Sequence, residues 1–477
     1  MGGSLDYLSQ SVCHAERVMS ISSYELKGMH ILPFLRHQSI LAFRNGDKYN
    51  KQVLEIPRQS FAGRLKSLIP ARLETNHFEN TQVLFYDPHF KSVEINGKKY
   101  NPFLDPFLEV YDSRGVLTTK TSFQWSDSFS QSIWTHPITE VEKDGWLPGF
   151  LRSYPRMKDE TTIDSLIASW KKETGIEINK SHLLNAIFRA AFAKQSFTKL
   201  LEGSKVEMVF FECYYKPEVF GLIAAARSLG IKTIDIQHGK QGTHHLMYSH
   251  WSAAPEGGFN TVPDEFWNWG EESVENIRSS SSIEFLKNHK PKAVGFPWLD
   301  RCRNQLPFTL DLKSQGFLKR LSSFDSRILI TLQPETVDNE GAIPSELLDA
   351  MLTIRENRAW LIRLHPSMKQ LPNRYDSLLD VENVFIEIPT ALPLYVLLNH
   401  STHHITKFSS VAFEANAFNV PTLIIGQIGA SLFKRQFNSK EFMSSLETTI
   451  AEFVDRDRFD INMSGYFKKF EPNSIEL

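Results

Sequence analysis

The sequence predicts an α/β protein built from two parallel-sheet domains in series. One observation is a βαβ pattern at residues 207–242, where two short apolar runs, Met208–Phe211 and Lys232–Ile236, flank a helical segment. Further runs of this kind follow residue 292, with helical segments between several of them. Such runs are typical of parallel strands that are covered on both faces. The length of 477 residues also favours roughly two or three domains over a single core.

The βαβ pattern is the centre of the prediction. Its helical segment, Glu218–Leu229, stops at Gly230, and its two runs end at Glu212 and at Gln237-His238-Gly239. Glycine directly after the last periodic residue is a common helix stop. Ligands of open parallel sheets bind outside the carboxyl ends of the strands. Glu212 and His238 are therefore the first candidates for a functional site.

The remaining elements of the first domain are expected on either side of this unit. Asn96-Gly97 between short alternating runs indicates a hairpin, in a β-rich insertion near residues 90–155. Helical spacing is present over residues 161–202. The other elements expected before residue 90 are a strand at Ser39–Phe43, a short helix at Phe61–Leu68 and a strand at Gln82–Tyr86.

The second domain is expected to repeat the parallel-sheet pattern, so that two Rossmann-like domains face a central cleft. Its expected strands are Ala293–Val294, Arg327–Leu332, Trp360–Leu364, Val384–Ile388, His403–Thr406 and Pro421–Ile425. The predicted division of the chain is an N-terminal domain at 1–262, a hinge at 263–292, a C-terminal domain at 293–450 and a tail helix at 451–477.

Composition excludes several classes of protein. Lysine plus arginine number 53 and aspartate plus glutamate 55, which gives a net charge of −2 and argues against nucleic acid as the main partner. The three cysteines, Cys13, Cys213 and Cys302, form no CxxC pair, so a reducing compartment is the simpler interpretation. The N-terminus lacks a secretory signal pattern, and no apolar stretch reaches the roughly 20 residues that span a bilayer. We therefore expect a cytoplasmic protein.

The expected strand Trp360–Leu364 leads into His365-Pro366-Ser367. Because side chains alternate along a strand, Arg363 and His365 are expected on the same side, where a forked guanidinium and an imidazole can together hold a phosphate. The structural alternative is that Pro366 ends the strand and His365 bonds a backbone carbonyl.

A second candidate anion site follows the run His403–Thr406. Ser409 and Ser410 fall where a helix should begin, so their hydroxyls and the free backbone N–H groups are expected to point the same way. Helix capping alone would also select serine there. Neither serine is followed three residues later by an acid, so Glu414 is not part of a capping box and is expected to accept hydrogen bonds from a sugar. Lys407, just before the turn, adds a positive charge.

In the first domain, Gly239 after His238 is expected to let a ligand approach the backbone closely. A buried histidine with a purely structural role is the alternative for His238. The nearby His244, His245 and His250 match no metal-binding spacing, and no Cys or Asp cluster completes a ligand set. A metal site is not expected.

The order of these motifs resembles a known group of enzymes. The motifs are QHG, GFPWLD, RLHPS, TKFSSVAFEA and VPTLIIG, and they cover roughly residues 205–430. In this order they resemble the two-domain GT-B glycosyltransferases of bacterial surface polysaccharide synthesis. His365-Pro366 and Ser409-Ser410 are similar to the HP and SS/T motifs that hold the CMP part of the donor in bacterial sialyltransferases and polysialyltransferases. The CMP-dependent β-Kdo transferases and the CDP-glycerol glycerophosphotransferases have related arrangements.

One motif departs from the sialyltransferase pattern. Those enzymes carry two acids and a glycine at the catalytic base, whereas Pro255-Glu256-Gly257 has a single acid and lies after the QHG loop. This departure argues against sialic acid as the donor sugar, and leaves a CMP-linked or other nucleotide-linked sugar open. The resemblance implies an oligosaccharide or lipid-linked glycan as acceptor, for capsule, lipopolysaccharide or a related polysaccharide, and peripheral association with the cytoplasmic membrane.

The mechanism expected from this resemblance needs two kinds of group. His365, Ser409, Ser410 and the helix start would stabilise the departing phosphate, and a base in the first domain would take the acceptor's proton. Glu212 is ranked first as that base because it ends its strand, with His238 and Asp235 as the other candidates. Asp455-Arg456-Asp457 is on an expected helix rather than a loop, so neither metal nor cofactor is expected.

Three other functions fit the same architecture. A UDP-sugar 2-epimerase would convert its nucleotide-sugar without an acceptor. A polyol-phosphate transferase would release CMP from CDP-glycerol. A non-catalytic nucleotide-binding scaffold would turn over neither compound.

Overall fold

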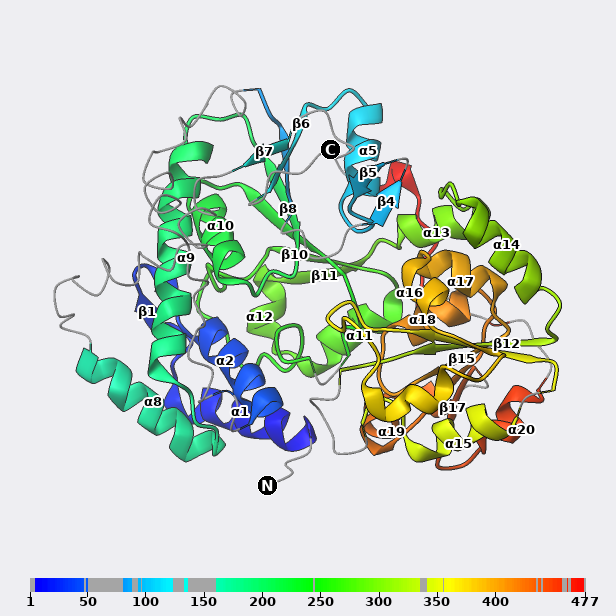
Figure 1. Cartoon of the computed structure of the whole chain (residues 1–477). Coiled ribbons are helices and arrows are strands. Elements are labelled where there is room, and N and C mark those ends of the chain that lie inside the picture. Colours follow the sequence, from blue (N-terminus) through cyan, green and yellow to red (C-terminus); the bar gives the residue numbers. More distant parts are fainter. Residues whose placement is uncertain are drawn as a thin grey trace, which may run out of the picture. The chain divides into compact units, whose positions relative to one another are not determined.

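The computed structural model of the chain (Figure 1) divides into two compact units. Unit 1 comprises Met1–Phe296 and Lys468–Leu477, and unit 2 comprises Pro297–Phe467. The described residues are 5–46, 49, 80–87, 93–95, 97–122, 133–135, 160–242, 245–334, 341–354, 356–434, 436–438, 441–456, 461 and 465–475.

Unit 1 is built on a parallel sheet, which in the described residues has seven strands in the order β11-β10-β9-β8-β3-β6-β7. Each neighbouring pair is parallel. In chain order the strands are β3 (Val83–Asp87), β6 (Thr118–Ser122), β7 (Ile133–Thr135), β8 (Met208–Glu212), β9 (Lys232–Ile236), β10 (Glu265–Asn268) and β11 (Lys290–Ala293). Two antiparallel pairs stand apart from this sheet, β1 (Glu25–Leu26) with β2 (Met29–His30), and β4 (Val93–Ile95) with β5 (Lys98–Tyr100).

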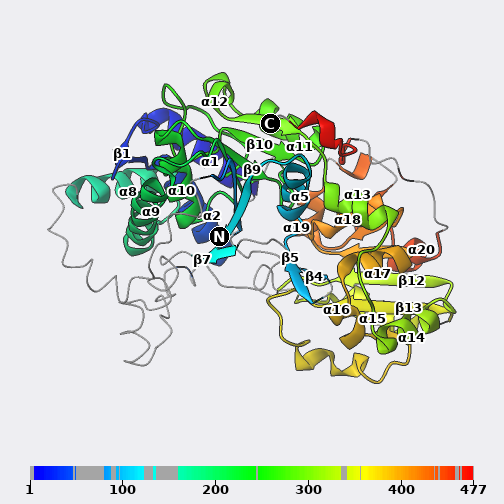
Figure 2. The ribbon, with the colours of Figure 1, turned by 90° about the horizontal axis from the view of Figure 1, so that it is seen from above.

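Helices cover both faces of this sheet. The described helices are α1 (Leu5–Met19), α2 (Leu32–Asn45), α5 (Asp105–Ser113), α8 (Glu160–Thr174), α9 (Lys180–Leu201), α10 (Pro217–Ser228), α11 (Glu271–Ser280) and α12 (Ile283–Asn288). Figures 1 and 2 both place α1, α2, α8, α9 and α10 together. On this helical face the core includes Leu84, Val209 and Phe211 of the sheet.

Alternation along the strands gives the opposite face an aromatic core. Phe210 stacks on Phe85 with ring centroids 4.9 Å apart and meets Trp267 edge-on at 5.1 Å. Phe107 of α5 covers Trp267, and Phe470 from the end of the chain packs edge-on against Phe107 at 5.4 Å. The last residues of the chain therefore complete this face.

Hydrogen bonds to backbone carbonyls attach the returning segment to the rest of unit 1. Lys468 N donates to the Trp269 carbonyl (2.7 Å), and Arg114 Nη1 donates to the Ile475 carbonyl (2.9 Å). Gly295 has a φ of +107°, and a side chain there would lie 2.6 Å from the Lys468 carbonyl oxygen. Glycine is required because the returning segment crosses the backbone at this point.

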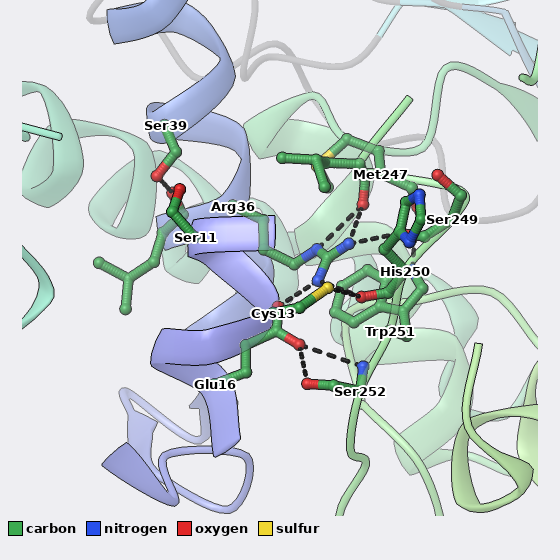
Figure 3. A network of polar contacts seen from close by, with 12 residues as sticks. Ser11, Cys13, Glu16, Arg36, Ser39, Met247, Ser249, His250, Trp251 and Ser252 are labelled. Atoms are coloured by element: carbon green, nitrogen blue, oxygen red, sulfur yellow. Dashed lines mark hydrogen bonds and ion pairs between the residues drawn. The ribbon is translucent and has the colours of Figure 1, made fainter. Parts of the chain in front are cut away.

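A buried ion pair ties the N-terminal helices to the segment after β9 (Figure 3). Arg36 of α2 and Glu16 of α1 are in contact, and both side chains are fully buried. Arg36 also donates to three carbonyls, those of Leu246, Ser249 and His250, and its guanidinium lies 4.0 Å from the ring centre of Trp251. Glu16 accepts hydrogen bonds from the backbone N–H and the hydroxyl of Ser252, which Figure 3 shows as dashed lines. The charges are thus compensated by several hydrogen bonds as well as by each other.

Unit 2 has a second parallel sheet, with six strands among the described residues in the order β14-β13-β12-β15-β16-β17. The strands are β12 (Ser326–Thr331), β13 (Arg358–Arg363), β14 (Val384–Phe385), β15 (His403–Thr406), β16 (Thr422–Ile424) and β17 (Phe442–Ser444). Its described helices are α13 (Pro297–Asn304), α14 (Leu312–Leu321), α15 (Ser345–Thr353), α16 (Glu387–Ala391), α17 (Leu394–His400), α18 (Val411–Ala417), α19 (Gln427–Leu432) and α20 (Ile450–Val454). Figure 1 shows helices on both faces of the sheet.

The prediction of two parallel-sheet α/β domains is confirmed by these topologies. The strands of the βαβ pattern, the strand near Gln82 and the hairpin at β4 and β5 are all present. In unit 2 the strand His403–Thr406 has the predicted limits. The predicted cleft between the domains stays a prediction.

The predicted domain limits differ from the observed units. Residues 263–292, expected to be a hinge, contribute β10, α11, α12 and β11 to unit 1. Their strands carry polar residues that find distant partners: Glu265 of β10 pairs with Lys232 (2.9 Å) and Lys292 (2.8 Å). In the predicted tail helix at 451–477, the described helix α20 covers only Ile450–Val454, and the final segment belongs to unit 1.

Some other local predictions were wrong, and some concern residues outside the described ranges. Ser39–Phe43 is helical, within α2, and the Ser39 hydroxyl donates to the Leu35 carbonyl one turn earlier. Val384–Ile388 is a strand only at β14, because α16 begins at Glu387. The β-rich insertion contains the β4–β5 hairpin, but α5 and β6 within it form a regular crossover of the main sheet. The helix expected at Phe61–Leu68 and most of 123–155 lie outside the described residues.

Gly221 allows α9 and α10 to pack closely, which leads to a stability prediction. An added Cβ would collide with the Ala190 carbonyl and lie 2.6 Å from Ala193 Cβ. We expect Gly221→Ala to lower the free energy of unfolding by about 1–3 kcal/mol, as overpacking does. Gly316, inside α14 and open to solvent, is the matched control: Gly316→Ala should raise it by about 0.5–1 kcal/mol. Urea unfolding of both variants measures the two effects, and equal effects would contradict the proposed helix contact.

The buried histidine His404 makes stability depend on pH. Its Nε2 contacts Thr331 Oγ1 (2.8 Å) and its Nδ1 contacts Thr422 Oγ1 (3.0 Å). Burial lowers the pKa of His404 from 6.5 to about 3. The unfolded chain therefore binds the proton first, so stability from neutral His404 is complete above about pH 6.5 and is lost as the pH falls towards 3.

His404→Gln should remove this dependence. Over about pH 4–6 the wild-type unfolding free energy should fall more steeply than that of the variant, by about 1.4 kcal/mol per pH unit. Urea unfolding at several pH values compares the two slopes. Parallel slopes would show that His404 is not held neutral.

Candidate functional site

The carboxyl ends of the strands in unit 2 bring the two predicted phosphate motifs to one edge of the sheet. Thr331, the last residue of β12, pairs in register with Arg363 of β13 on one side and with Thr406 of β15 on the other. His365 follows β13 by two residues, and Ser409 follows β15 by three. The two motifs therefore flank β12 at the same edge, where open parallel sheets bind ligands.

His365 has a defined tautomer. Its Nδ1 accepts a hydrogen bond from the Ser367 backbone N–H (3.2 Å) and lies 2.8 Å from the Ser367 hydroxyl. Because Nδ1 is an acceptor, the proton of the neutral ring is on Nε2, which is then a donor. His365 is half-buried and the following Pro366 is exposed. The predicted role as a phosphate donor needs this tautomer.

Arg363 has a structural function in unit 2. Its Nη1 donates to the carbonyls of Pro389 (2.8 Å) and Leu392 at the end of α16. Burial lowers the pKa of Arg363 to about 10. A guanidinium that caps a helix end holds α16 against the sheet edge. It is therefore a weaker candidate for the phosphate than His365.

Ser409 and Ser410 are half-buried at the start of α18. The Ser409 hydroxyl accepts from Val411 N (3.2 Å), so this serine helps to shape the turn, as the capping alternative expected. A serine hydroxyl has a second lone pair and a proton that can still meet a ligand. Lys407 is buried, and its ammonium donates to the Gly341 carbonyl (3.0 Å), which fixes a positive charge beside this turn.

Glu414 differs from the prediction that it is available to a sugar. Its carboxylate accepts a hydrogen bond from the Tyr395 hydroxyl at 2.5 Å, and both side chains are buried. Burial raises the pKa of Tyr395 well above its ordinary value, and the Glu414 charge adds to this effect. The sequence correctly excludes Glu414 from a capping box. It does not reveal the partner of Glu414, because Tyr395 is on α17 and no local pattern identifies it.

In unit 1, Glu212 belongs to a buried polar cluster. At the end of β8 it is 0 % exposed, and its Oε1 accepts from Asn101 Nδ2 at 3.4 Å. The same amide nitrogen donates to Asp87 at the end of β3 (3.0 Å). Lys120 of β6 contacts both Asp87 (2.9 Å) and Asp105. This cluster of Asp87, Asn101, Asp105, Lys120 and Glu212 joins the ends of β3 and β8 to the middle of β6.

The cluster has more carboxyl groups than positive charges. Burial raises the pKa of Asp105 to about 6, although the adjacent Lys120 partly offsets this. Burial disfavours the ammonium of Lys120, but Asp105 and Asp87 outweigh that effect and raise its pKa. A base must contact the hydroxyl that it deprotonates. The complete burial of Glu212 therefore does not support its first rank among the candidates.

Asp235 lies on the other face of the sheet from Glu212. Ile236, not Asp235, is the register partner of Glu212, and successive side chains alternate. Asp235 is 0 % exposed and accepts from the Tyr214 backbone N–H at 3.1 Å. Burial raises its pKa well above the ordinary value, against the opposing effect of Tyr248 and Tyr214. A structural role fits this position.

His238 lies in the loop that follows β9. Gln237 holds this loop: it accepts from Trp269 N (2.8 Å), and its amide donates to the Gly239 carbonyl (2.9 Å). His238 is 7 % exposed, and its ring meets the edge of Phe103 at 6.5 Å. A Cβ on Gly239 would meet no protein atom within 4 Å, and its φ is outside the left-handed region. The fold itself thus does not require glycine at 239.

Two residues beside His238 were not identified as site residues from the sequence. The Tyr215 hydroxyl lies 3.5 Å from His238 Nε2 and 3.4 Å from His245 Nε2. His245 was considered only as a metal ligand, and His244 lies outside the described residues. The position of Tyr215 just after a strand end was a usable signal, since the same argument selected Glu212.

Metal-binding clusters and membrane-spanning helices are both absent from the described part of the chain. No group of three or more His, Cys, Asp or Glu side chains there is arranged to hold a metal ion. No helix there has the length and apolar character needed to cross a membrane. Metal independence stays a prediction.

Comparisons with known proteins give structural similarity alone. No protein-family model matches the chain, and no curated protein matches it by sequence. The solved structure of UDP-GlcNAc 2-epimerase from Methanocaldococcus jannaschii is 13% identical, over 81% of this chain and 97% of that one, with a TM-score of 0.46.

Two further solved structures have lower TM-scores. The UDP-GlcNAc 2-epimerase from Neisseria meningitidis, bound to UDP-GlcNAc, is 14% identical over 72% of this chain and 82% of that one, with a TM-score of 0.40. The wall teichoic acid polymerase TagF is 11% identical over 90% and 93%, with a TM-score of 0.39. Scores this low carry no assignment of function. The two parallel-sheet units are established by their own strand topology, without these comparisons.

Proposed function

We propose that the chain is a glycosyltransferase that uses a nucleotide-activated sugar, with a CMP-linked sugar as the favoured donor and a glycan as acceptor. The observation that carries this proposal is the edge of the unit 2 sheet, where His365 and the Ser409-Ser410 turn flank β12. Both motifs resemble those that hold CMP in sialyltransferases and polysialyltransferases. Their placement at one sheet edge supports a single phosphate-binding site in unit 2.

The chemistry of this site suits a departing phosphate. As the glycosidic bond breaks, negative charge develops on the nucleotide phosphate. The His365 Nε2–H and the two serine hydroxyls are donors to that charge, and the buried ammonium of Lys407 adds a fixed positive potential. Donors that the fold has already oriented stabilise a charge without the cost of reorganising water. Arg363 has a lesser part in this proposal because it caps α16.

The preferred base is His238. An acceptor hydroxyl must reach the base within about 3 Å, and Glu212 and Asp235 are both 0 % exposed. His238 lies in a loop beyond the strand ends and beside the half-buried Tyr215. A neutral imidazole is also a better base near neutral pH than an ordinary carboxylate, because its pKa is closer to the working pH.

Donor binding is tested by removing the proposed phosphate contacts. We expect His365→Ala, and the double variant Ser409→Ala with Ser410→Ala, to weaken CMP binding by about 10–100-fold, since each lost hydrogen bond to a charged group costs about 1.5–3 kcal/mol. Isothermal titration with CMP measures this. Ser322→Ala with Ser323→Ala is the matched control, because the hydroxyls of these adjacent serines donate to carbonyls in the last turn of α14. Unchanged CMP affinity in both site variants would remove the assignment.

The donor class is tested with the unmodified protein. Incubation with CMP-linked sugars and a glycan acceptor should give CMP and an extended glycan. Release of CMP from CDP-glycerol instead would identify a polyol-phosphate transferase. Conversion of a UDP-sugar without acceptor would identify an epimerase. Either of those results would overturn the proposed reaction.

The choice of base is tested by comparing two substitutions by glutamine. His238→Gln should lower turnover by about 10²–10⁴-fold with little change in CMP affinity, because general-base catalysis contributes about that much. Glu212→Gln should mainly change stability, because its carboxylate is part of the buried cluster with Asn101. Steady-state kinetics and thermal unfolding separate the effects. A large loss of turnover in a stable Glu212→Gln protein would restore Glu212 as the base.

A further inference from the structure

A tyrosine lies between two histidines where β8 and β9 end. The Tyr215 hydroxyl oxygen is 3.5 Å from Nε2 of His238 and 3.4 Å from Nε2 of His245. The ring centroids of the two histidines are 6.2 Å and 5.4 Å from that of Tyr215. Tyr215 and His245 are half-buried, and His238 is buried. One phenol thus contacts both imidazoles through the same kind of nitrogen.

A phenol hydroxyl has a single proton, which restricts the arrangements of this cluster. It donates to one Nε2 atom at a time, and it accepts from the other only when that nitrogen carries a proton. When His238 gains a proton, its Nε2–H donates to the Tyr215 oxygen, and the Tyr215 proton turns to Nε2 of His245. No covalent bond is broken in this rearrangement. The protonation of one imidazole therefore favours a particular tautomer of the other.

We propose that Tyr215 is a positioning residue that couples the protonation of His238 to that of His245, which makes His245 part of the same site. The inference rests on the proposed function for the role of His238 as base. The coupling itself follows from the geometry of the three side chains. In the proposed reaction the imidazolium form of His238 is stabilised because its Nε2–H donates to the Tyr215 oxygen, while the Tyr215 hydroxyl donates to Nε2 of His245.

The backbone on both sides of the cluster is held in place. Cys213, between Glu212 and the tyrosines, has a left-handed φ of +57°, a conformation that is costly outside glycine and is kept where the surroundings require it. His245 begins a single helical turn. The His245 carbonyl accepts hydrogen bonds from the backbone N–H groups of Tyr248 (2.8 Å) and Ser249 (3.0 Å).

Arg36 caps the other end of that turn. It donates to the carbonyls of Ser249 and His250 and to that of Leu246 within the turn (Figure 3). Because Arg36 is itself buried and paired with Glu16, the turn that carries His245 cannot move without exposing or separating that ion pair. The contact between Tyr215 and His245 is thus determined by the core.

Other ionisable groups surround the cluster. His37 of α2 has its ring 5.5 Å from that of Tyr215, and Lys216 follows Tyr215 in the chain. On the sheet side the neighbours are Asp235, Tyr214 and Tyr248, the last with its ring 4.8 Å from that of His245. These groups affect both imidazoles directly, so a test has to separate their influence from coupling through Tyr215.

A double-mutant cycle read by NMR makes this separation. The titration midpoint and tautomer of His245 are measured with ¹⁵N-histidine-labelled full-length protein in four forms: wild type, His238→Gln, Tyr215→Phe and the double variant. We expect His238→Gln to displace the His245 midpoint by about 0.5–1 pH unit when Tyr215 is present. In the Tyr215→Phe background the displacement should be lost, because Phe keeps the ring and removes only the hydroxyl.

Two outcomes of this cycle would contradict the coupling through Tyr215. No displacement in the wild-type background, or the same displacement without the hydroxyl, overturns the proposal. The reciprocal measurement follows the His238 midpoint in a His245→Gln protein. It should also show a displacement that is lost in the Tyr215→Phe background, and it keeps the test valid if one variant folds poorly. Tyr7→Phe is the control, since this half-exposed tyrosine on α1 bonds to the Thr174 carbonyl instead.

This test does not depend on the reaction. Loss of CMP binding or of transfer in the wild-type protein would remove the proposed function and leave the NMR cycle unaffected. A failed cycle in a protein that binds CMP and transfers sugar would remove only the coupling through Tyr215.

Discussion

The buried contact between Arg36 and Glu16 determines the form of unit 1 around its candidate site. Taking two charges out of water costs several kcal/mol for each ion, so such a pair is stable only when further hydrogen bonds satisfy both partners. Here the carbonyls of Leu246, Ser249 and His250 satisfy the guanidinium, and Ser252 satisfies the carboxylate. The N-terminal helices therefore hold the segment after β9 in place. The position of His245, which is on that segment, depends on this contact.

The two units use their sheet edges differently. In unit 1 the strand ends gather carboxyl groups into a buried cluster, where Lys120 and Asn101 limit the repulsion between them. In unit 2 the corresponding edge gathers donors, from His365, the Ser409 turn and Lys407. An edge rich in donors suits a phosphate, whereas a closed acidic cluster does not. This contrast is the physical reason to place nucleotide binding in unit 2.

The sequence predicted the elements whose apolar pattern is visible locally. The apolar runs of β8 and β9 and the helix between them were identified within one or two residues, because burial on both faces leaves a continuous apolar signal. The sequence did not predict β6 and β10. The buried charges of these two strands are neutralised by residues elsewhere in the chain. Lys120 in β6 pairs with Asp87 and Asp105, and Glu265 in β10 pairs with two lysines. No local pattern can show that a charged residue has a buried partner.

The same limit explains the choice of base. Position at a strand end correctly identified Glu212 and His238 as neighbours of the sheet edge. Which of them a substrate can contact depends on side-chain alternation, on burial and on the loop after β9. Glu212 is enclosed with Asn101, and Asp235 lies on the opposite face. His238 is left beside Tyr215, whose hydroxyl also contacts His245. In the proposed reaction a base that becomes positively charged needs such a partner, so the role proposed for Tyr215 follows from the same chemistry that favours the histidine.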